Sequence, residues 1–229
     1  VKHVKYPYIS EVPKEGEIPH KMHTWQEGKR LNKEYLQRKL GLKRDRNIPL
    51  LGFIGRFDPL QKGIDILHKM LRNDDLSQYQ LVILGSGKPD WEERFQWLST
   101  FYPKSISCTF TFDEALAHQI YAASDFMLIP SKFEPCGLVQ MIAMYFGTVP
   151  IVHKTGGLRD SVKDGHNGFV FEKYTGEALQ KEVKRAIDIW QHKKSVYEQM
   201  VGNAFNTDFS WDKSAQKYLD LYNNLISNS

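Results

Sequence analysis

The chain has 229 residues, and its 31 Lys and Arg against 27 Asp and Glu give a formal net charge of +4. Hydrophobic residues make up 41% and charged residues 25% of it, which is typical of a folded globular protein and excludes an intrinsically disordered chain. The small, scattered positive charge predicts no nucleic-acid partner, and no apolar run reaches the roughly 20 residues of a membrane helix or forms a secretory signal in residues 1–10, so we expect no membrane partner.

The first part of the chain differs in composition from the rest. Residues 1–30 contain three Pro and two Gly with little apolar periodicity, which predicts a linker or an arm that lies on another surface. We expect the linker or arm over residues 1–24 and a folded domain over residues 25–229. Apolar side chains at helical spacing predict the first helix over residues 32–42, where Gly41 ends it.

Short apolar runs then alternate with segments long enough for one helix each. Runs that are apolar along their whole length suit parallel strands covered by helices on both faces, so the alternation predicts an α/β fold with an open, doubly wound parallel sheet. Helical spacing over residues 176–226 predicts a helical C-terminal tail. The predicted strands are Leu50–Ile54, Leu81–Leu84, Ile106–Phe110, Phe126–Ile129 and Val149–Val152, and the helices between them cover Ile64–Leu71, Trp91–Phe101, Glu114–Ala123 and Leu138–Phe146.

Ligands of such sheets bind outside the carboxyl ends of the strands, so the residues after each run are informative. After the first run, Arg56 and Lys62 lie between Gly55 and Gly63, which makes a plausible cradle for a diphosphate. The alternative is two surface cations in an ordinary turn. After the second run, residues 85–89 match neither the P-loop nor the dinucleotide fingerprint, so ATP or NAD binding by these motifs is not expected.

Two later loops carry groups suited to a sugar and a phosphate. Glu134 lies in the loop after the fourth run, where it either accepts hydrogen bonds from ligand hydroxyls or caps the next helix. Gly137 in the same loop lets the backbone approach a ligand. After the fifth run, Thr155 offers a hydroxyl, and residues 156–157 expose backbone amides of the kind that bind phosphate.

Three strings of residues, taken together, resemble one family. They are Gly55-Arg56…Gln61-Lys62-Gly63, Pro130-Ser131-Lys132-Phe133-Glu134-Pro135-Cys136-Gly137-Leu138 and Lys154-Thr155-Gly156-Gly157-Leu158-Arg159-Asp160. They are similar to the glycogen and starch synthases, from about Trp25 to the end of the chain, including the Phe209-Ser210-Trp211 that opens the family's last helix. Ile142 stands where related transferases have a second glutamate, which favours the synthases over sucrose-phosphate relatives.

The resemblance implies a Rossmann-like domain, the C-terminal, donor-binding half of a GT-B glycosyltransferase whose N-terminal acceptor half is absent. It implies transfer of glucose, with retention, from a nucleotide-glucose to an α-1,4-glucan of glycogen or starch. ADP-glucose and ADP are the expected ligands, with UDP-glucose as the alternative, and the α-glucan acceptor binds through the missing half. We expect this chain alone to bind nucleotide without turnover, in the cytoplasm or, in a plant or alga, the plastid stroma.

The resemblance also assigns roles to individual residues. Arg56 and Lys62 clamp the diphosphate and stabilise the departing nucleotide, while Glu134 binds glucose hydroxyls. An aromatic side chain stacks on the base, either Phe112 or, as a substitute, Tyr121. No metal and no cofactor are implied, because cations and helix N-termini meet the diphosphate charge. The remaining contacts are Cys136, Gly137 and Leu138 beside the sugar and Thr155, Gly156 and Gly157 at the distal phosphate.

Other interpretations remain open. The chain could be a nucleotide-sugar-sensing domain without catalysis, or part of a sucrose- or trehalose-type transferase. Only two cysteines occur, which indicates a reducing compartment, and Cys108 is expected in the core. The histidines show no metal-ligand spacing. Four tryptophans at helical positions are expected to pack rather than form a glucan platform, namely Trp91, Trp97, Trp190 and Trp211.

Overall fold

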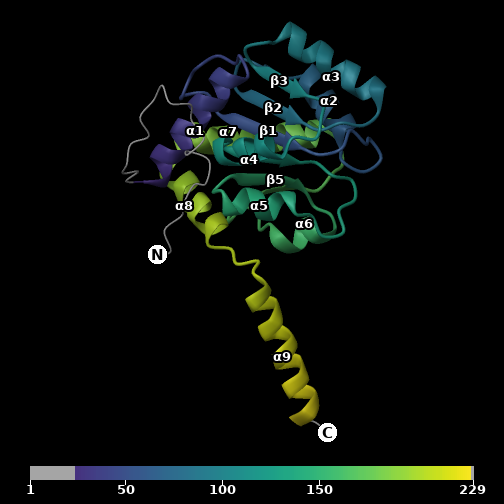
Figure 1. Ribbon diagram of the computed structural model, residues 1–229, viewed down its shortest axis with the longest axis vertical. Helices are drawn as coiled ribbons and strands as arrows, with labels where there is room; N and C mark the ends of the chain where they lie inside the picture. The colour runs from purple at the N-terminus through teal and green to yellow at the C-terminus, as the bar shows by residue number, and fades with distance from the viewer. Residues whose placement is uncertain (1–23, 228–229) are drawn as a thin grey trace.

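The computed structural model describes residues 24–227, and in it six parallel strands form one sheet with helices on both faces (Figure 1). The strand order is β3-β2-β1-β4-β5-β6. Strands β1 to β3 are added toward one edge of the sheet and β4 to β6 toward the other. This change in strand order between β1 and β4 places a crevice at their carboxyl ends. The strands are β1 (Leu50–Ile54), β2 (Gln80–Leu84), β3 (Ile106–Thr109), β4 (Phe126–Ile129), β5 (Val149–His153) and β6 (Phe169–Phe171).

Helices on the two faces bury two separate hydrophobic clusters against the sheet. One cluster joins the sheet to α2, α3, α7 and α8, and the other joins it to α1, α4, α5 and α6. Along β1, Leu51 and Phe53 face the first cluster and Leu50 faces the second, as the period of two in a strand requires. The helices are α1 (Trp25–Lys39), α2 (Ile64–Arg72), α3 (Pro89–Phe101), α4 (Glu114–Ala123), α5 (Val139–Tyr145), α6 (Gly156–Ser161), α7 (Gly176–His192), α8 (Lys194–Phe205) and α9 (Trp211–Ser227).

The predicted α/β class, the doubly wound sheet and the helical tail are confirmed. The first helix begins earlier than its apolar spacing indicates, because Thr24 caps it by accepting a hydrogen bond from the Glu27 backbone N–H (3.2 Å). The interpretation of residues 25–30 as linker is therefore wrong, whereas residues 1–23 lie outside the described part of the chain. The sequence analysis also missed β6, whose three residues are too few to show a pattern.

Buried cations fasten α1 to the sheet at the amino ends of the strands. The Lys29 ammonium donates to the carbonyls of Tyr121 (3.4 Å) and Phe146 (3.2 Å) and to the Thr148 hydroxyl. Burial lowers the pKa of Lys29 to about 7, although the nearby Asp125 carboxylate opposes this change. The Lys33 ammonium lies 2.7 Å from the carboxylate of Asp125.

The last helix, α9, differs from the others because none of its side chains is buried. It extends away from the body of the molecule in Figure 1, and large apolar side chains such as Trp211 (87% exposed) and Ile226 (75%) face solvent along it. No helix within residues 24–227 is long and apolar enough to cross a membrane.

Candidate functional site at the carboxyl ends of β1, β4 and β5

Three loops that follow neighbouring strands meet at the crevice. The loop after β1 contacts the loop after β4 through a hydrogen bond from the Lys132 backbone N–H to the Gln61 carbonyl (2.8 Å). Gly63 permits this approach, since its φ is +74° and a Cβ there would lie 2.0 Å from the Pro130 carbonyl oxygen. The loops that carry Lys62 and Glu134 are therefore held together by backbone contacts alone, before any side chain is considered.

The side chains of Lys62 and Glu134 meet across this junction. Lys62 Nζ lies 2.6 Å from Glu134 Oε2, and the Ser131 hydroxyl donates to the same oxygen at 3.0 Å. Both charged side chains are largely shielded from water, being 21% and 12% exposed. A cation and a carboxylate in this position can face the two ends of one ligand, such as a phosphate and a hydroxyl-bearing sugar.

The loop after β5 packs against the same β4 loop. The Gly157 backbone N–H donates to the Glu134 carbonyl (3.0 Å), and the Thr155 hydroxyl donates to the Lys132 carbonyl (3.3 Å). Side chains would not fit at residues 156 and 157, because a Cβ at Gly156 would lie 2.1 Å from the Glu134 carbonyl oxygen. In this structure the Gly157 amide is thus used between loops, and the glycine pair serves to bring the loops together.

Gln140 secures the turn that carries Cys136, Gly137 and Leu138. Its buried side-chain amide donates to the carbonyls of Cys136 (3.0 Å) and Gly137 (2.8 Å) and contacts the Ser161 hydroxyl (3.1 Å). Cys136 and Leu138 are exposed at this turn, the latter by 66%. The turn predicted to lie beside the sugar is therefore accessible to solvent, and the buried Gln140 side chain holds its backbone in place.

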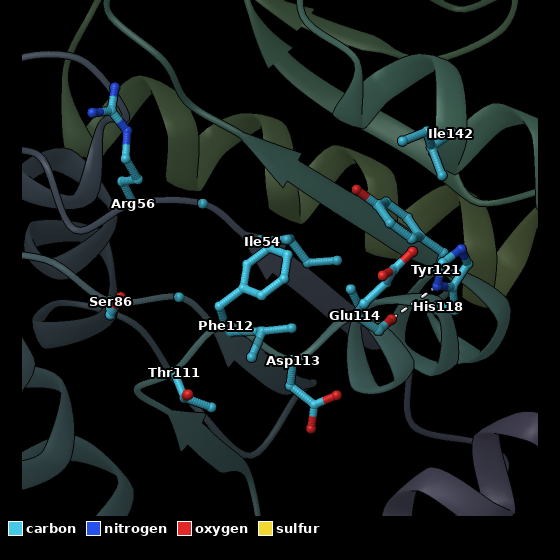
Figure 2. A pocket seen from close by; sticks show the side chains of 14 residues that line it. Ile54, Arg56, Ser86, Thr111, Phe112, Asp113, Glu114, His118, Tyr121 and Ile142 are labelled. Carbon is cyan, nitrogen blue, oxygen red and sulfur yellow. Dashed lines mark hydrogen bonds between the residues drawn. The ribbon is translucent and has the colours of Figure 1, made fainter.

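A cavity of about 570 Å³ opens between the ends of β1 and β2 and the start of α4 (Figure 2). Arg56 and Phe112 both line it, and Figure 2 places Arg56 on the opposite side of Phe112 from Tyr121 and Ile142. The Arg56 guanidinium donates to the Gln61 side chain at 2.6 Å. Lys62, Glu134 and Thr155 do not line this cavity but lie at the neighbouring loop junction described above.

The two aromatic candidates differ in accessibility. Phe112 is 91% exposed, whereas Tyr121 is buried and its ring stacks on Phe146 with centroids 6.0 Å apart. Burial also raises the pKa of Tyr121 to about 12, so its hydroxyl stays protonated. Phe112 is thus the ring with a free face for a ligand.

The cavity has further lining residues, of which Glu114 was not predicted from the sequence as a site residue. Glu114 and His118 line it on the first turns of α4, and His118 Nδ1 contacts the Glu114 carbonyl (2.8 Å; Figure 2). The signal for Glu114 was its position shortly after β3, because ligands bind at the carboxyl ends of all the parallel strands. Residues 85–86, which follow β2 directly, also line the cavity. Among residues 24–227 no cluster of three His, Cys, Asp or Glu side chains is arranged to hold a metal ion.

Comparison with known proteins identifies the family. The model of the family described as "Glycosyl transferases group 1" matches residues 32–205. The chain belongs to this family. It is 46% identical to a glycogen synthase from Thermosipho melanesiensis over 202 residues, which is 86% of this chain and 42% of that protein. A glycogen synthase from Streptococcus gordonii is 41% identical over 205 residues, 87% of this chain and 43% of that protein.

Solved structures give the same result. The catalytic domain of Starch Synthase IV from Arabidopsis thaliana, bound to ADP and acarbose, matches with a TM-score of 0.77 and 37% identity, covering 87% of this chain and 43% of that one. A sucrose-phosphate synthase from Thermosynechococcus elongatus matches with a TM-score of 0.61 and 26% identity, over 84% and 49% of the two chains. The resemblance to the glycogen and starch synthases is confirmed. The chain spans less than half the length of these relatives.

Proposed function

We propose that this chain is the donor-binding half of a retaining glucosyltransferase that elongates α-1,4-glucan from ADP-glucose. The observation that carries the proposal is the contact between Lys62 and Glu134 (2.6 Å) at the junction of the β1 and β4 loops. Similarity to glycogen synthases and to a starch synthase bound to ADP supports the same reading.

Arg56 and Lys62 hold the diphosphate in this proposal. An ammonium carries three N–H donors, so the contact with Glu134 leaves two for phosphate oxygens. Negative charge grows on the departing ADP as the bond to glucose breaks, and fixed cations stabilise that charge in the transition state. The Arg56 guanidinium adds a planar donor set suited to phosphate oxygens.

Glu134 accepts hydrogen bonds from glucose hydroxyls, with Cys136, Gly137 and Leu138 beside the sugar. Its partly buried side chain is held by Lys62 and Ser131, which makes it an oriented acceptor. The distal phosphate lies against the loop after β5, at Thr155 and Gly156, while Gly157, whose amide donates to the Glu134 carbonyl, holds this loop in place instead of binding phosphate as the sequence predicted. No metal is required, because the two cations face the diphosphate directly.

The base stacks on Phe112 at the rim of the 570 Å³ cavity. A ring that is 91% exposed in this position gains a stacking partner without giving up core contacts. Tyr121 is already stacked on Phe146, so it forms part of the cavity wall and does not stack on the base.

Transfer to glucan requires donor and acceptor to be oriented together in one cleft. Because the chain spans less than half of its relatives, we propose that it binds ADP and ADP-glucose but does not elongate glucan alone. Calorimetric titration with ADP, UDP and their glucose forms tests this. We expect binding of the ADP forms to exceed that of the UDP forms. The absence of binding by all four would overturn the proposal, and glucan elongation by this chain alone would overturn the assignment of the acceptor site elsewhere.

A further inference from the structure

The helix α3 presents two aromatic side chains to solvent. Trp97 is 55% exposed and Phe101 is 60% exposed, and their ring centroids lie 4.2 Å apart at an interplanar angle of 37°. The expectation that the tryptophans pack holds for Trp91 and Trp190, which lie against the core, but not for the exposed Trp97 and Trp211. We call Trp97 and Phe101 the α3 platform.

The α3 platform is not needed to hold α3 in place. Another face of the helix already packs through Phe95 and Leu98, which are buried in the core. Two adjacent aromatic rings left in water are the kind of exposed apolar surface that marks a binding site on a folded protein. The α3 platform therefore has a free surface that the fold itself does not use.

A cavity of about 500 Å³ adjoins Trp97, and its lining is electrically balanced. Arg72 and Arg94 supply two positive charges, and Asp90 and Glu93 supply two negative charges. His68 also lines the cavity, and its pKa is lowered by burial and by the two arginines, so its ring is neutral near pH 7. Such a lining offers many hydrogen-bond donors and acceptors without an excess of either charge.

We propose that the α3 platform and this cavity bind a neutral α-glucan chain. Sugar rings carry apolar C–H faces that cover aromatic rings and hydroxyls that pair with charged side chains, whereas a nucleotide or nucleic acid would require an excess of cations. The choice of α-glucan as the polysaccharide rests on the proposed function.

This surface is separate from the donor site. The two cavities share no lining residue, and α3 lies at the end of the body farthest from α9 in Figure 1. A glucan held at a second site raises the effective concentration of nearby chain ends for the catalytic cleft. The α3 platform would therefore tether the enzyme to a branched glucan particle.

Native electrophoresis of the 229-residue chain in gels containing glycogen tests the proposal. We expect the wild-type chain and the control Trp211→Ala, another exposed tryptophan, to be retarded equally, and the double variant Trp97→Ala/Phe101→Ala to need at least a tenfold higher glycogen concentration. A wild-type chain that is not retarded, equal retardation by dextran, or undiminished retardation of the double variant would each overturn it.

A second measurement locates the contact and separates the two proposals. Titration with maltoheptaose should shift the indole N–H resonance of Trp97 in NMR spectra and leave that of Trp211 in place, and the reverse pattern would refute the α3 platform. The double variant should bind ADP as the wild type does, because it lies outside the donor cavity. If the chain bound glucan but not ADP, the proposed function would be wrong, whereas the proposal of glucan binding at the α3 platform would stand.

Discussion

Lys62 Nζ and Glu134 Oε2 lie 2.6 Å apart although 72 residues separate them in the sequence. The contact depends on the strand order, because β1 and β4 are neighbours in the sheet and their loops leave the same edge. It joins the cation assigned to the diphosphate with the carboxylate assigned to the sugar. Changing either member should therefore separate nucleotide binding from sugar binding.

Lys62→Ala should weaken ADP binding by about 1.5–3 kcal/mol, the range for a hydrogen bond to a charged group. That corresponds to a roughly 10- to 150-fold increase in Kd, measured by calorimetry. Lys69→Ala, on the α2 helix that follows the Lys62 loop and paired with Glu177 at an exposed site, is the matched control and should bind ADP normally. Unchanged ADP affinity in the Lys62 variant would remove this residue from the clamp.

Glu134→Gln should retain ADP binding, because it removes a negative charge near the diphosphate and leaves Lys62 in place. It should abolish the advantage of ADP-glucose over ADP, since the charged acceptor for the glucose hydroxyls is gone. Parallel titrations with the two ligands measure this difference directly. An advantage of ADP-glucose equal to that of the wild type would contradict the assignment of Glu134 to the sugar.

Phe112→Ala should weaken ADP binding by about 1–3 kcal/mol, the scale of base stacking on an aromatic ring. The side chain is 91% exposed, so the free energy of unfolding should stay unchanged in urea denaturation. Trp211→Ala removes a similarly exposed ring from α9 and serves as the control. If ADP bound equally well to both variants, the base would have to lie elsewhere in the cavity.

Gly157→Ala should destabilise the fold and weaken ADP binding, because its Cβ would lie 2.2 Å from the Cys136 carbonyl oxygen and force the loops apart. We expect a loss of about 1–3 kcal/mol in the free energy of unfolding, as for overpacked sites. Gly202→Ala in α8 meets no atom within 4 Å and should gain about 0.5–1 kcal/mol. Urea denaturation of both variants checks the contrast; equal stabilities would refute the tight loop junction.

Lys29→Met should flatten the dependence of stability on pH. The unfolded chain protonates this amine below about pH 10.4, whereas the folded chain does so only below about pH 7. Between these values the unfolded state holds more protons, so wild-type stability rises with pH across this window. Urea denaturation at pH 7 and pH 10 should therefore show a smaller rise for the variant than for the wild type, and equal rises would show that the Lys29 amine titrates alike in both states.

The sequence predicted the sheet well because its central strands are apolar on both faces, and it predicted the three loops because they follow those strands directly. It could not predict which face of α3 points outward, since Trp97 and Leu98 are neighbours and only tertiary packing distinguishes them. Nor could it predict the burial of Lys29, because a lysine near the start of an amphipathic helix has the same pattern whether it is exposed or buried. The short β6 strand exists only through pairing with β5.

The helix α9 has a consequence for how motion is distributed in the chain. None of its side chains is buried, so it lacks the tertiary packing that supplies most of the stability of helices in proteins. Its amide protons should therefore exchange with deuterated solvent far sooner than those of β1 or β4, whose flanking side chains are buried. Among residues 24–227, α9 is thus the helix that can change its packing with the least loss of existing contacts when it meets another surface.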